Sequence, residues 1–223
     1  MSDTVCFIVL KCIKYKESGY IINGYSQLNG MESYILKTAQ HKRRSSGLSY
    51  IYPLSIIEIT PSQKIYGSMK SIKELYPHIN TTKIRSNLVR SSIAFYISEL
   101  VLKTIKEPGN DNTLFQFLYD QIVDLDSLPN ISPDFRLYFT LDLIKYLGYQ
   151  ITDDLSNNLD YFDIASCKFV NTTNESGLIL DKESSNILRN LLTCKNRYNQ
   201  NITQNRFQRY CFINNMIKFI SYH

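Results

Sequence analysis

The period of the hydrophobic pattern changes near residue 80, and this change constrains the fold more than any other feature of the sequence. Residues 1–80 contain short segments rich in Ile, Val, Tyr and Thr, separated by polar turn residues, which is typical of β-strands. From residue 81 onward, apolar residues recur at helical spacing. The two patterns predict an α+β chain with a β domain at 1–80 and a mostly helical domain at 81–223.

The β half is expected to form a small closed barrel of the OB type. Five short strands in so few residues fit a barrel better than a sandwich, which usually needs more strands. Ile57 and Ile59 alternate with polar neighbours, which indicates a strand with one buried face. Asn-Gly pairs at 23–24 and 29–30 predict tight turns. The expected strands cover residues 5–15, 19–27, 32–39, 49–60 and 64–72.

The helical half begins with a stretch that predicts one long helix over 81–107, which stops at Pro108-Gly109. A second helix is expected from a cap at Asp111 or Asn112 to a point before Pro129. A third is expected at 132–148, where the cap residue Ser132 is followed by Pro133 in the first turn and the helix ends at Gly148. Residues 152–180 are interpreted as loop. The remaining expected elements are a short strand around 162–170 and helices at 181–193 and 204–220.

The charges are unevenly distributed along the chain, whose formal net charge is +5. The net charge is +5 over residues 1–80, +3 over 81–110, −8 over 111–163 and +5 over 164–223. Basic surface attracts polyanions through phosphate neutralisation, whereas an acidic block repels them. The pattern therefore predicts that DNA approaches one side of the protein, although ordinary solvated surface is the alternative for a charge of this size.

Catalytic chemistry is not indicated anywhere in the sequence. No GxxxxGK[ST], GxGxxG, HExxH or GxSxG motif is present, and the three histidines are far apart in polar surroundings. Asp120, Asp124 and Asp126 favour a solvated helix face over a metal pair. We therefore expect a non-enzymatic protein without cofactor or metal.

The five cysteines form no CxxC pair, so neither a disulfide framework nor a four-cysteine zinc site is indicated. No apolar stretch is long enough to span a bilayer, and an acid precedes the short apolar run at the start of the sequence, unlike a secretory signal. These features predict a cytoplasmic protein, associated with the nucleoid if it binds DNA.

The strongest candidate for DNA binding is the segment 37–47, which carries three consecutive basic residues between two expected strands. Tyrosines interleave with lysines on the neighbouring strands, and aromatic faces beside cations can hold unstacked bases without reading their sequence. The candidate DNA-binding residues are Lys11, Lys14, Tyr15, Lys16, Tyr34, Lys37, Lys42, Arg43 and Arg44. A further basic surface would join them if the last helix folds back beside the barrel: Lys83, Arg85, Arg90, Arg206 and Arg209.

The order of these features resembles the RecO family of DNA repair and recombination proteins over most of the chain. The resemblance rests on the opening strand with Ile8-Val9-Leu10, the turn Tyr15-Lys16-Glu17, the basic run Lys42-Arg43-Arg44 with the strand through Ile57-Glu58, and the helix from Phe139 to Leu147-Gly148-Tyr149. Many members carry two cysteine pairs that bind zinc after this helix. Here residues 150–177 contain only Cys167, so the resemblance implies a zinc-free version.

The resemblance implies an N-terminal OB fold, binding to single- and double-stranded DNA, strand annealing, and loading of the RecA recombinase without covalent chemistry. It also implies that RecR and the acidic C-terminal tail of single-stranded DNA-binding protein are partners. Two alternatives stay open. The barrel could serve as a scaffold for protein partners of the repair machinery, or the protein could be an RNA-binding protein of the OB type.

Overall fold

The structure, a computed structural model, divides into two compact units, residues 1–129 and 130–223, which are described separately. The residues described are 4–16, 19–37, 47–66, 69–105, 109, 111–151, 159–171, 178–194, 197 and 201–223. Among these residues, no helix combines the length and apolar content needed to cross a bilayer.

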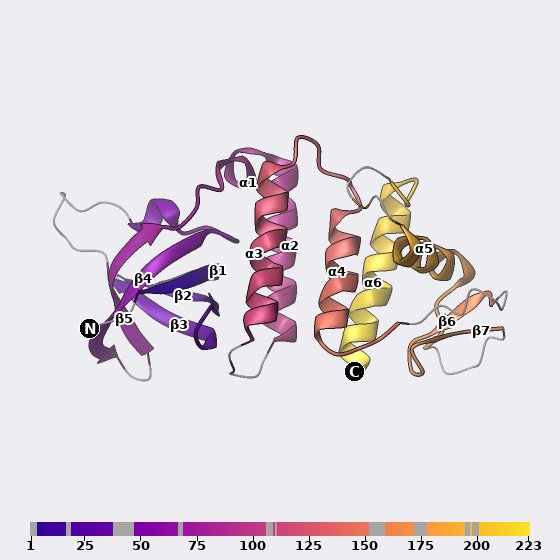
Figure 1. Cartoon of the computed structure of the whole chain (residues 1–223), viewed down its shortest axis with the longest axis horizontal. Helices are drawn as coiled ribbons and strands as arrows, with labels where there is room; N and C mark the ends of the chain where they lie inside the picture. Colours follow the sequence, from indigo (N-terminus) through magenta and orange to yellow (C-terminus); the bar gives the residue numbers. More distant parts are fainter. Residues whose placement is uncertain are drawn as a thin grey trace. The chain divides into compact units, whose positions relative to one another are not determined.

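The first unit opens with a closed five-stranded barrel, which confirms the predicted α+β class and the OB-like barrel (Figure 1). Its strands follow one another around the barrel in the order β1-β2-β3-β5-β4. The short parallel contact between β3 and β5 closes the ring, and the other pairs are antiparallel. A 3₁₀ helix, η1 (Gly47–Tyr50), precedes the fourth strand. The strands are β1 (Val5–Tyr15), β2 (Gly19–Ser26), β3 (Gly30–Lys37), β4 (Ile56–Tyr66) and β5 (Met69–Pro77).

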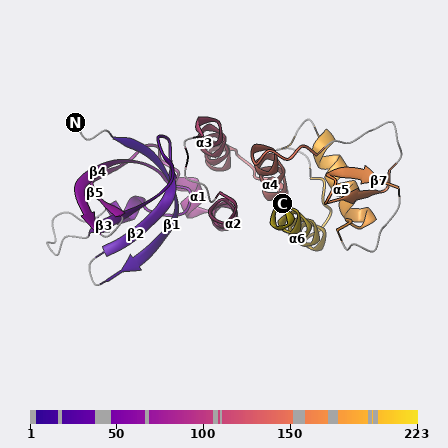
Figure 2. The ribbon, with the colours of Figure 1, turned by 90° about the horizontal axis from the view of Figure 1, so that it is seen from below.

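The barrel interior is filled by apolar side chains from alternate strand positions, as the period of two predicts. Ile57 and Ile59 are both fully buried there, which confirms the predicted buried face of this strand. Figure 2 shows the strands curving into a ring around this core. The buried cluster consists of Val5, Phe7, Val9, Ile22, Tyr34, Ile57 and Ile59.

Only one of the two predicted Asn-Gly turns is a turn. Residues 27–29 form the connection between β2 and β3, and Gly30 follows with a φ of 74°, which favours glycine. The prediction for Asn23-Gly24 is wrong, because both residues lie within β2. A Cβ on Gly24 would lie 2.1 Å from the carbonyl oxygen of Ile8, so glycine is needed here for close approach of two strands.

Three helices complete the first unit: α1 (Thr82–Ser86), α2 (Leu88–Thr104) and α3 (Asn112–Ser127). The single long helix predicted over 81–107 is wrong, because the chain breaks at Asn87 with extended backbone angles. The Asn87 side chain accepts hydrogen bonds from the N–H groups of Val89 and Arg90, and so it caps α2. A polar residue inside a helical pattern thus marks a new helix start.

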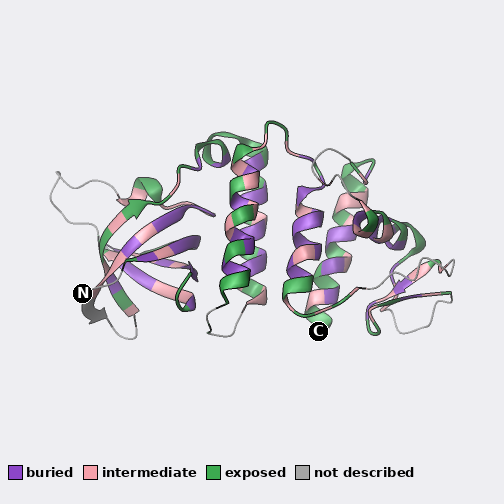
Figure 3. Ribbon diagram, viewed as in Figure 1, coloured by how far each residue is buried: buried purple, intermediate pink, exposed green. Residues whose placement is uncertain are grey.

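The predicted limits of α3 are confirmed. Asp111 accepts hydrogen bonds from the N–H groups of Thr113 and Leu114, and the helix ends at Ser127, ahead of Pro129. Figure 3 shows that α3 has both buried and exposed faces. On the buried face, Phe115 stacks on Tyr25 of β2 with ring centroids 6.5 Å apart. The helices therefore pack onto the barrel, and the compact unit extends to residue 129, well beyond the change of pattern near residue 80.

The second unit contains α4 (Phe135–Tyr146), β6 (Tyr161–Asp163), β7 (Lys168–Val170), α5 (Lys182–Thr193) and α6 (Arg206–Tyr222). The three predicted helices are confirmed, and the strand expected around 162–170 is a two-stranded antiparallel hairpin. Within the unit, α4 and α5 each contact α6.

The predicted cap residue Ser132 lies just before α4, and its Oγ accepts a hydrogen bond from the N–H of Asp134 at 3.1 Å, although the helix itself begins only at Phe135. Asp134 occupies the cap position but makes no capping hydrogen bond, and its side chain is fully buried. Its Oδ2 instead accepts hydrogen bonds from the N–H groups of Ile202 and Thr203, at 2.7 and 2.9 Å. Asp134 therefore fixes the chain just before α6 to the start of α4.

Candidate nucleic-acid interface

The outer half of β1 carries most of the described candidate DNA-binding residues. All side chains from Lys11 to Lys16 are exposed, and 36% of Tyr15 is accessible to solvent. This part of β1 pairs with β2, whereas its pairing with β4 stops at Ile8. The hairpin thus presents its lysines beyond the closed part of the barrel.

A bulge in β1 determines which way these side chains point. Val9 pairs with Gly24, but Lys11 pairs with Asn23, so one extra residue is inserted in β1 and the alternation of faces changes there. Lys11, Ile13 and Tyr15 consequently share one face of the hairpin, and Cys12 and Lys14 share the other. The predicted cations are therefore divided between two faces.

Tyr15 lies at the centre of a small aromatic and basic surface. It is opposite Gly19, which is in turn opposite Lys37 on β3, so Tyr15 and Lys37 lie on the same face of three adjacent strands. A Cβ on Gly19 would lie 3.9 Å from Cδ1 of the Tyr15 ring. The Nζ of Lys16 is 5.3 Å from the centroid of that ring. We call Lys11, Tyr15, Lys16 and Lys37 the Tyr15 surface.

Tyr34, another candidate, is not part of this surface. Its ring is 2% exposed and packs edge-to-face on Phe7 at 5.5 Å inside the barrel. Its hydroxyl donates a hydrogen bond to Glu32, and burial together with that carboxylate raises the pKa of Tyr34. Because neither face of its ring is accessible to solvent, Tyr34 is a core residue and cannot stack on a base.

The basic run Lys42-Arg43-Arg44 lies outside the described residues, so its role stays a prediction. Among the cations predicted to extend the surface in the first unit, Lys83 donates to the carbonyl oxygen of Ser127, and Arg85 donates to that of Ser49.

Arg90 has a structural role that the sequence did not indicate. Its side chain is buried, and its guanidinium donates hydrogen bonds to the carbonyl oxygens of Leu125, Asp126, Leu128 and Pro129. These carbonyls belong to the last turn of α3 and the residues after it, where helical partners are missing. Arg90 therefore caps α3 and is not available for a phosphate.

Arg206 and Arg209 belong to the second unit. Arg206 is exposed in the first turn of α6. Arg209 is only 18% exposed and lies 3.8 Å from the Asp134 carboxylate, while its Nη1 donates to Thr203. Arg209 thus neutralises a buried acid, and a joint surface with the barrel stays a prediction.

The acidic residues of α3 are engaged within the protein. The Asp126 side chain accepts a hydrogen bond from the N–H of Ile84, and Asp120 accepts one from Gln116. Within the described part of the chain, no three His, Cys, Asp or Glu side chains gather as metal ligands would. Cys167 Sγ and His223 Nε2 lie 3.5 Å apart, but these two side chains alone do not form a metal site.

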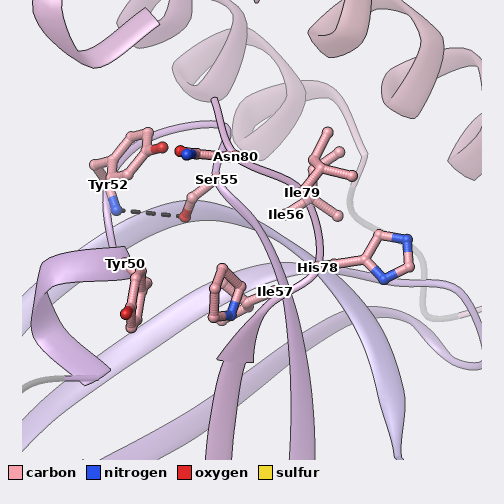
Figure 4. Close-up of a pocket in the computed structure, with 9 residues that line it drawn as sticks. Tyr50, Tyr52, Ser55, Ile56, Ile57, His78, Ile79 and Asn80 are labelled. Carbon is pink, nitrogen blue, oxygen red and sulfur yellow. Dashed lines mark hydrogen bonds between the residues drawn. The ribbon is translucent and has the colours of Figure 1, made fainter. Parts of the chain in front are cut away.

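Two tyrosines that the sequence analysis did not single out line a hollow on the barrel unit (Figure 4). Tyr50 ends η1, and Tyr52 follows two residues later. The signal that could have found them is the pattern Tyr50-Ile51-Tyr52-Pro53, which comes shortly after the basic run.

Comparison with known proteins agrees with this architecture. A family model described as "Recombination protein O C terminal" matches residues 85–210, which include helices of both units. A protein of Flavobacterium johnsoniae named DNA repair protein RecO is 30% identical over 190 residues, covering 84% of this chain and 78% of the relative. A protein of the same name from Flavobacterium psychrophilum is 27% identical over 218 residues, covering 97% and 90%. The corresponding protein of Azobacteroides pseudotrichonymphae is 30% identical over 166 residues, covering 73% and 68%.

Proposed function

This chain belongs to the RecO family of DNA repair proteins, and on that premise we propose that it is a DNA-binding recombination mediator. It anneals complementary strands and loads the RecA recombinase onto single-stranded DNA coated with single-strand-binding protein. Family membership is the observation that carries this proposal. Membership also confirms the prediction that the chain is a non-enzymatic protein.

The Tyr15 surface supports the proposed DNA contact. Lys16 lies beside the accessible Tyr15 ring, Lys37 shares its face, and Lys11 lies further along the same strand face. Cations beside an aromatic face suit a single strand, whose phosphates and unstacked bases are both exposed. Lys14 adds a cation on the opposite face of the same hairpin. Lys42, Arg43 and Arg44 belong to the proposed interface on the basis of the sequence alone.

The proposed partners are DNA, RecR and the acidic tail of single-stranded DNA-binding protein, with RecA as an indirect partner. The protein would then act in the cytoplasm, at the nucleoid. These partners follow from the family resemblance, and the family itself implies DNA and other repair proteins as partners.

Annealing of complementary strands coated with the cognate single-strand-binding protein tests the proposed function. We expect this chain to accelerate annealing without nucleotide or metal. We also expect the change Lys11→Gln with Lys16→Gln to weaken DNA binding and to lower the slope of log affinity against log salt, by about 0.7 for each phosphate contact to a single strand.

A matched control removes two lysines from the second unit, Lys182→Gln with Lys218→Gln, and should leave affinity and slope close to those of the unchanged protein. Both of these side chains are exposed. Equal effects of the two double variants would refute the assignment of the interface to the hairpin. A failure of the unchanged protein to accelerate annealing would refute the mediator function.

A further inference from the structure

A hollow of about 400 Å³ lies on the barrel unit, away from the strands that carry the Tyr15 surface. Its walls come from η1 and the following turn, from the start of β4, and from the segment after β5. Figure 4 shows Tyr50 and Tyr52 on one side and His78 on the other. A volume of this order is in the range of sites that bind small molecules, roughly 300–1,000 Å³.

The wall formed by Tyr52 is held in place from two directions. Its hydroxyl lies 3.1 Å from the carbonyl oxygen of Thr81, to which it donates a hydrogen bond. The guanidinium carbon of Arg85 is 5.9 Å from the centroid of the Tyr52 ring, and Arg85 is fixed by its hydrogen bond to Ser49. The aromatic wall therefore exists before any ligand binds, which lowers the entropic cost of binding.

Tyr50 supplies the accessible part of the site. Its ring is 42% exposed, although it lines the hollow. An exposed aromatic ring next to a preformed apolar wall is suited to stack on a flat heterocycle. The polar groups are few: among the described residues, the Asn80 amide makes no hydrogen bond, so it can donate to and accept from the edge of a base.

Arg85 adjoins the Tyr52 wall and is an exposed cation that a phosphate can approach. The carboxylate on the opposite side, Glu58, is already paired with His78 Nδ1 at 2.9 Å. A duplex cannot fill the hollow, because its bases are stacked and only their edges are exposed in the grooves. A single strand can, because its bases can turn out of the stack.

We propose that this hollow accepts one unstacked base of single-stranded DNA, which stacks on Tyr50 and meets Asn80 at its edge. The inference rests on the proposed DNA-binding function, but it concerns elements outside the Tyr15 surface. It assigns the protein a second contact that recognises single strands through a base and not through phosphate charge alone.

The test combines a change in the protein with a change in the DNA. Affinities of the unchanged protein and of Tyr50→Ala are measured for an oligothymidine, for an abasic deoxyribose-phosphate chain of equal length, and for a duplex. Stacking of one base on an aromatic ring strengthens binding about tenfold. Tyr50→Ala should therefore bind the oligothymidine about tenfold more weakly than the unchanged protein, with the same affinity as before for the abasic chain and the duplex.

Two further variants keep the result interpretable. Tyr50→Phe keeps a ring and should bind the oligothymidine like the unchanged protein. Tyr76→Ala removes an exposed tyrosine of β5 that does not line the hollow, and it should show no dependence on the base. Photo-crosslinking of an oligonucleotide that contains 5-iodouracil should attach the base to a peptide that contains Tyr50 or Tyr52.

The outcomes separate the two proposals. If the unchanged protein binds none of the three DNAs, the proposed function fails. A second outcome is that the protein binds DNA while Tyr50→Ala lowers the affinities for the oligothymidine and the abasic chain equally, or leaves both unchanged. In that case the proposed function stands and the base site is wrong. Loss confined to the oligothymidine, with a crosslink at Tyr50 or Tyr52, supports the base site.

Discussion

Replacement of Arg90 by leucine should destabilise the first unit strongly, although the sequence predicted a surface role for this arginine. The guanidinium is the common donor to four carbonyl oxygens at the end of α3, and its bond to Leu128 is 2.6 Å long. Leucine retains much of the apolar volume but leaves these carbonyls without a donor in a buried region.

The expected loss can be worked out from the two shortest bonds, those to Leu125 and Leu128. A hydrogen bond from a charged group contributes about 1.5–3 kcal/mol, so the loss of two costs about 3–6 kcal/mol. At about 2–4 °C per kcal/mol, the melting temperature should fall by about 10 °C. Arg90→Lys restores the charge but not the fork of donors, and should recover less than half of the loss.

Urea unfolding followed by far-UV circular dichroism measures this loss, since the chain has no tryptophan for fluorescence. Lys103→Met, on the same helix, is the matched control, because the Lys103 side chain is 74% exposed and its ion pair with Glu99 is exposed as well. We expect no measurable change for this control. If Arg90→Leu were as stable as the control, the capping role of Arg90 would be refuted.

Three other changes test the remaining structural assignments. Asp134→Ala removes the buried acceptor for the N–H groups of Ile202 and Thr203 and should cost the second unit about 3–5 kcal/mol in urea unfolding; a loss below about 1 kcal/mol would contradict this role. Gly24→Ala should cost at least about 1–3 kcal/mol through overpacking, because its Cβ would meet the Ile8 carbonyl oxygen at 2.1 Å, and an unchanged melting temperature would contradict the strand register. Burial, and then the charge of Glu58, raises the pKa of the Cys6 thiol to about 11. Because the unfolded chain loses this proton first, stability should fall as the pH rises from about 8.5 towards 11, and iodoacetamide at pH 8 should modify Cys6 about 100-fold more slowly than in the unfolded chain. Equal rates would show that Cys6 is not buried.

Features that depend on local chemistry could be predicted from the sequence. The first three strands follow from a period of two, and the limits of α3 follow from the polar cap at its start and Pro129 after its end. The fourth and fifth strands begin at residues 56 and 69, and not at the expected 49 and 64. The order of strands around the barrel could not be predicted in this way. It depends on the parallel contact of Tyr34 and Ile35 with β5, between residues far apart in the chain that share no local signal.

Two features of the fold have a common physical cause that the local sequence does not contain, because in each a glycine or a polar residue contacts a distant segment. Asn-Gly at 23–24 has the composition of a turn, but Gly24 is required by the neighbouring strand. Asp134 has the position of a helix cap, but it binds residues nearly seventy positions away. Local sequence propensity cannot predict such contacts, since the partners come close together only in the complete fold.

The candidate interface was predicted by residue type but not by geometry. The sequence placed Lys11, Lys14 and Tyr15 on one strand. The alternation of faces separates Lys14 from the other two, and the bulge after Val9 decides which face each side chain takes. Tyr34 has the same composition signal as Tyr15, yet it is buried because it faces the barrel interior. A strand pattern without its bulge therefore assigns side chains to the wrong face.

The charge map of the sequence overstates the surface that can bind DNA, and the structure explains why. Basic residues after residue 80 already bind protein acceptors: Arg90 of α2 binds carbonyls of α3, Arg209 of α6 lies beside Asp134, and Arg197, between α5 and α6, lies 2.5 Å from Asp142. Removal of these cations would change stability before it changed DNA affinity. Lys11, Lys14 and Lys16 are exposed on a hairpin beyond the barrel, where a phosphate can approach without breaking the fold. Variants of the hairpin lysines therefore isolate binding, whereas variants of the helical arginines combine binding with folding.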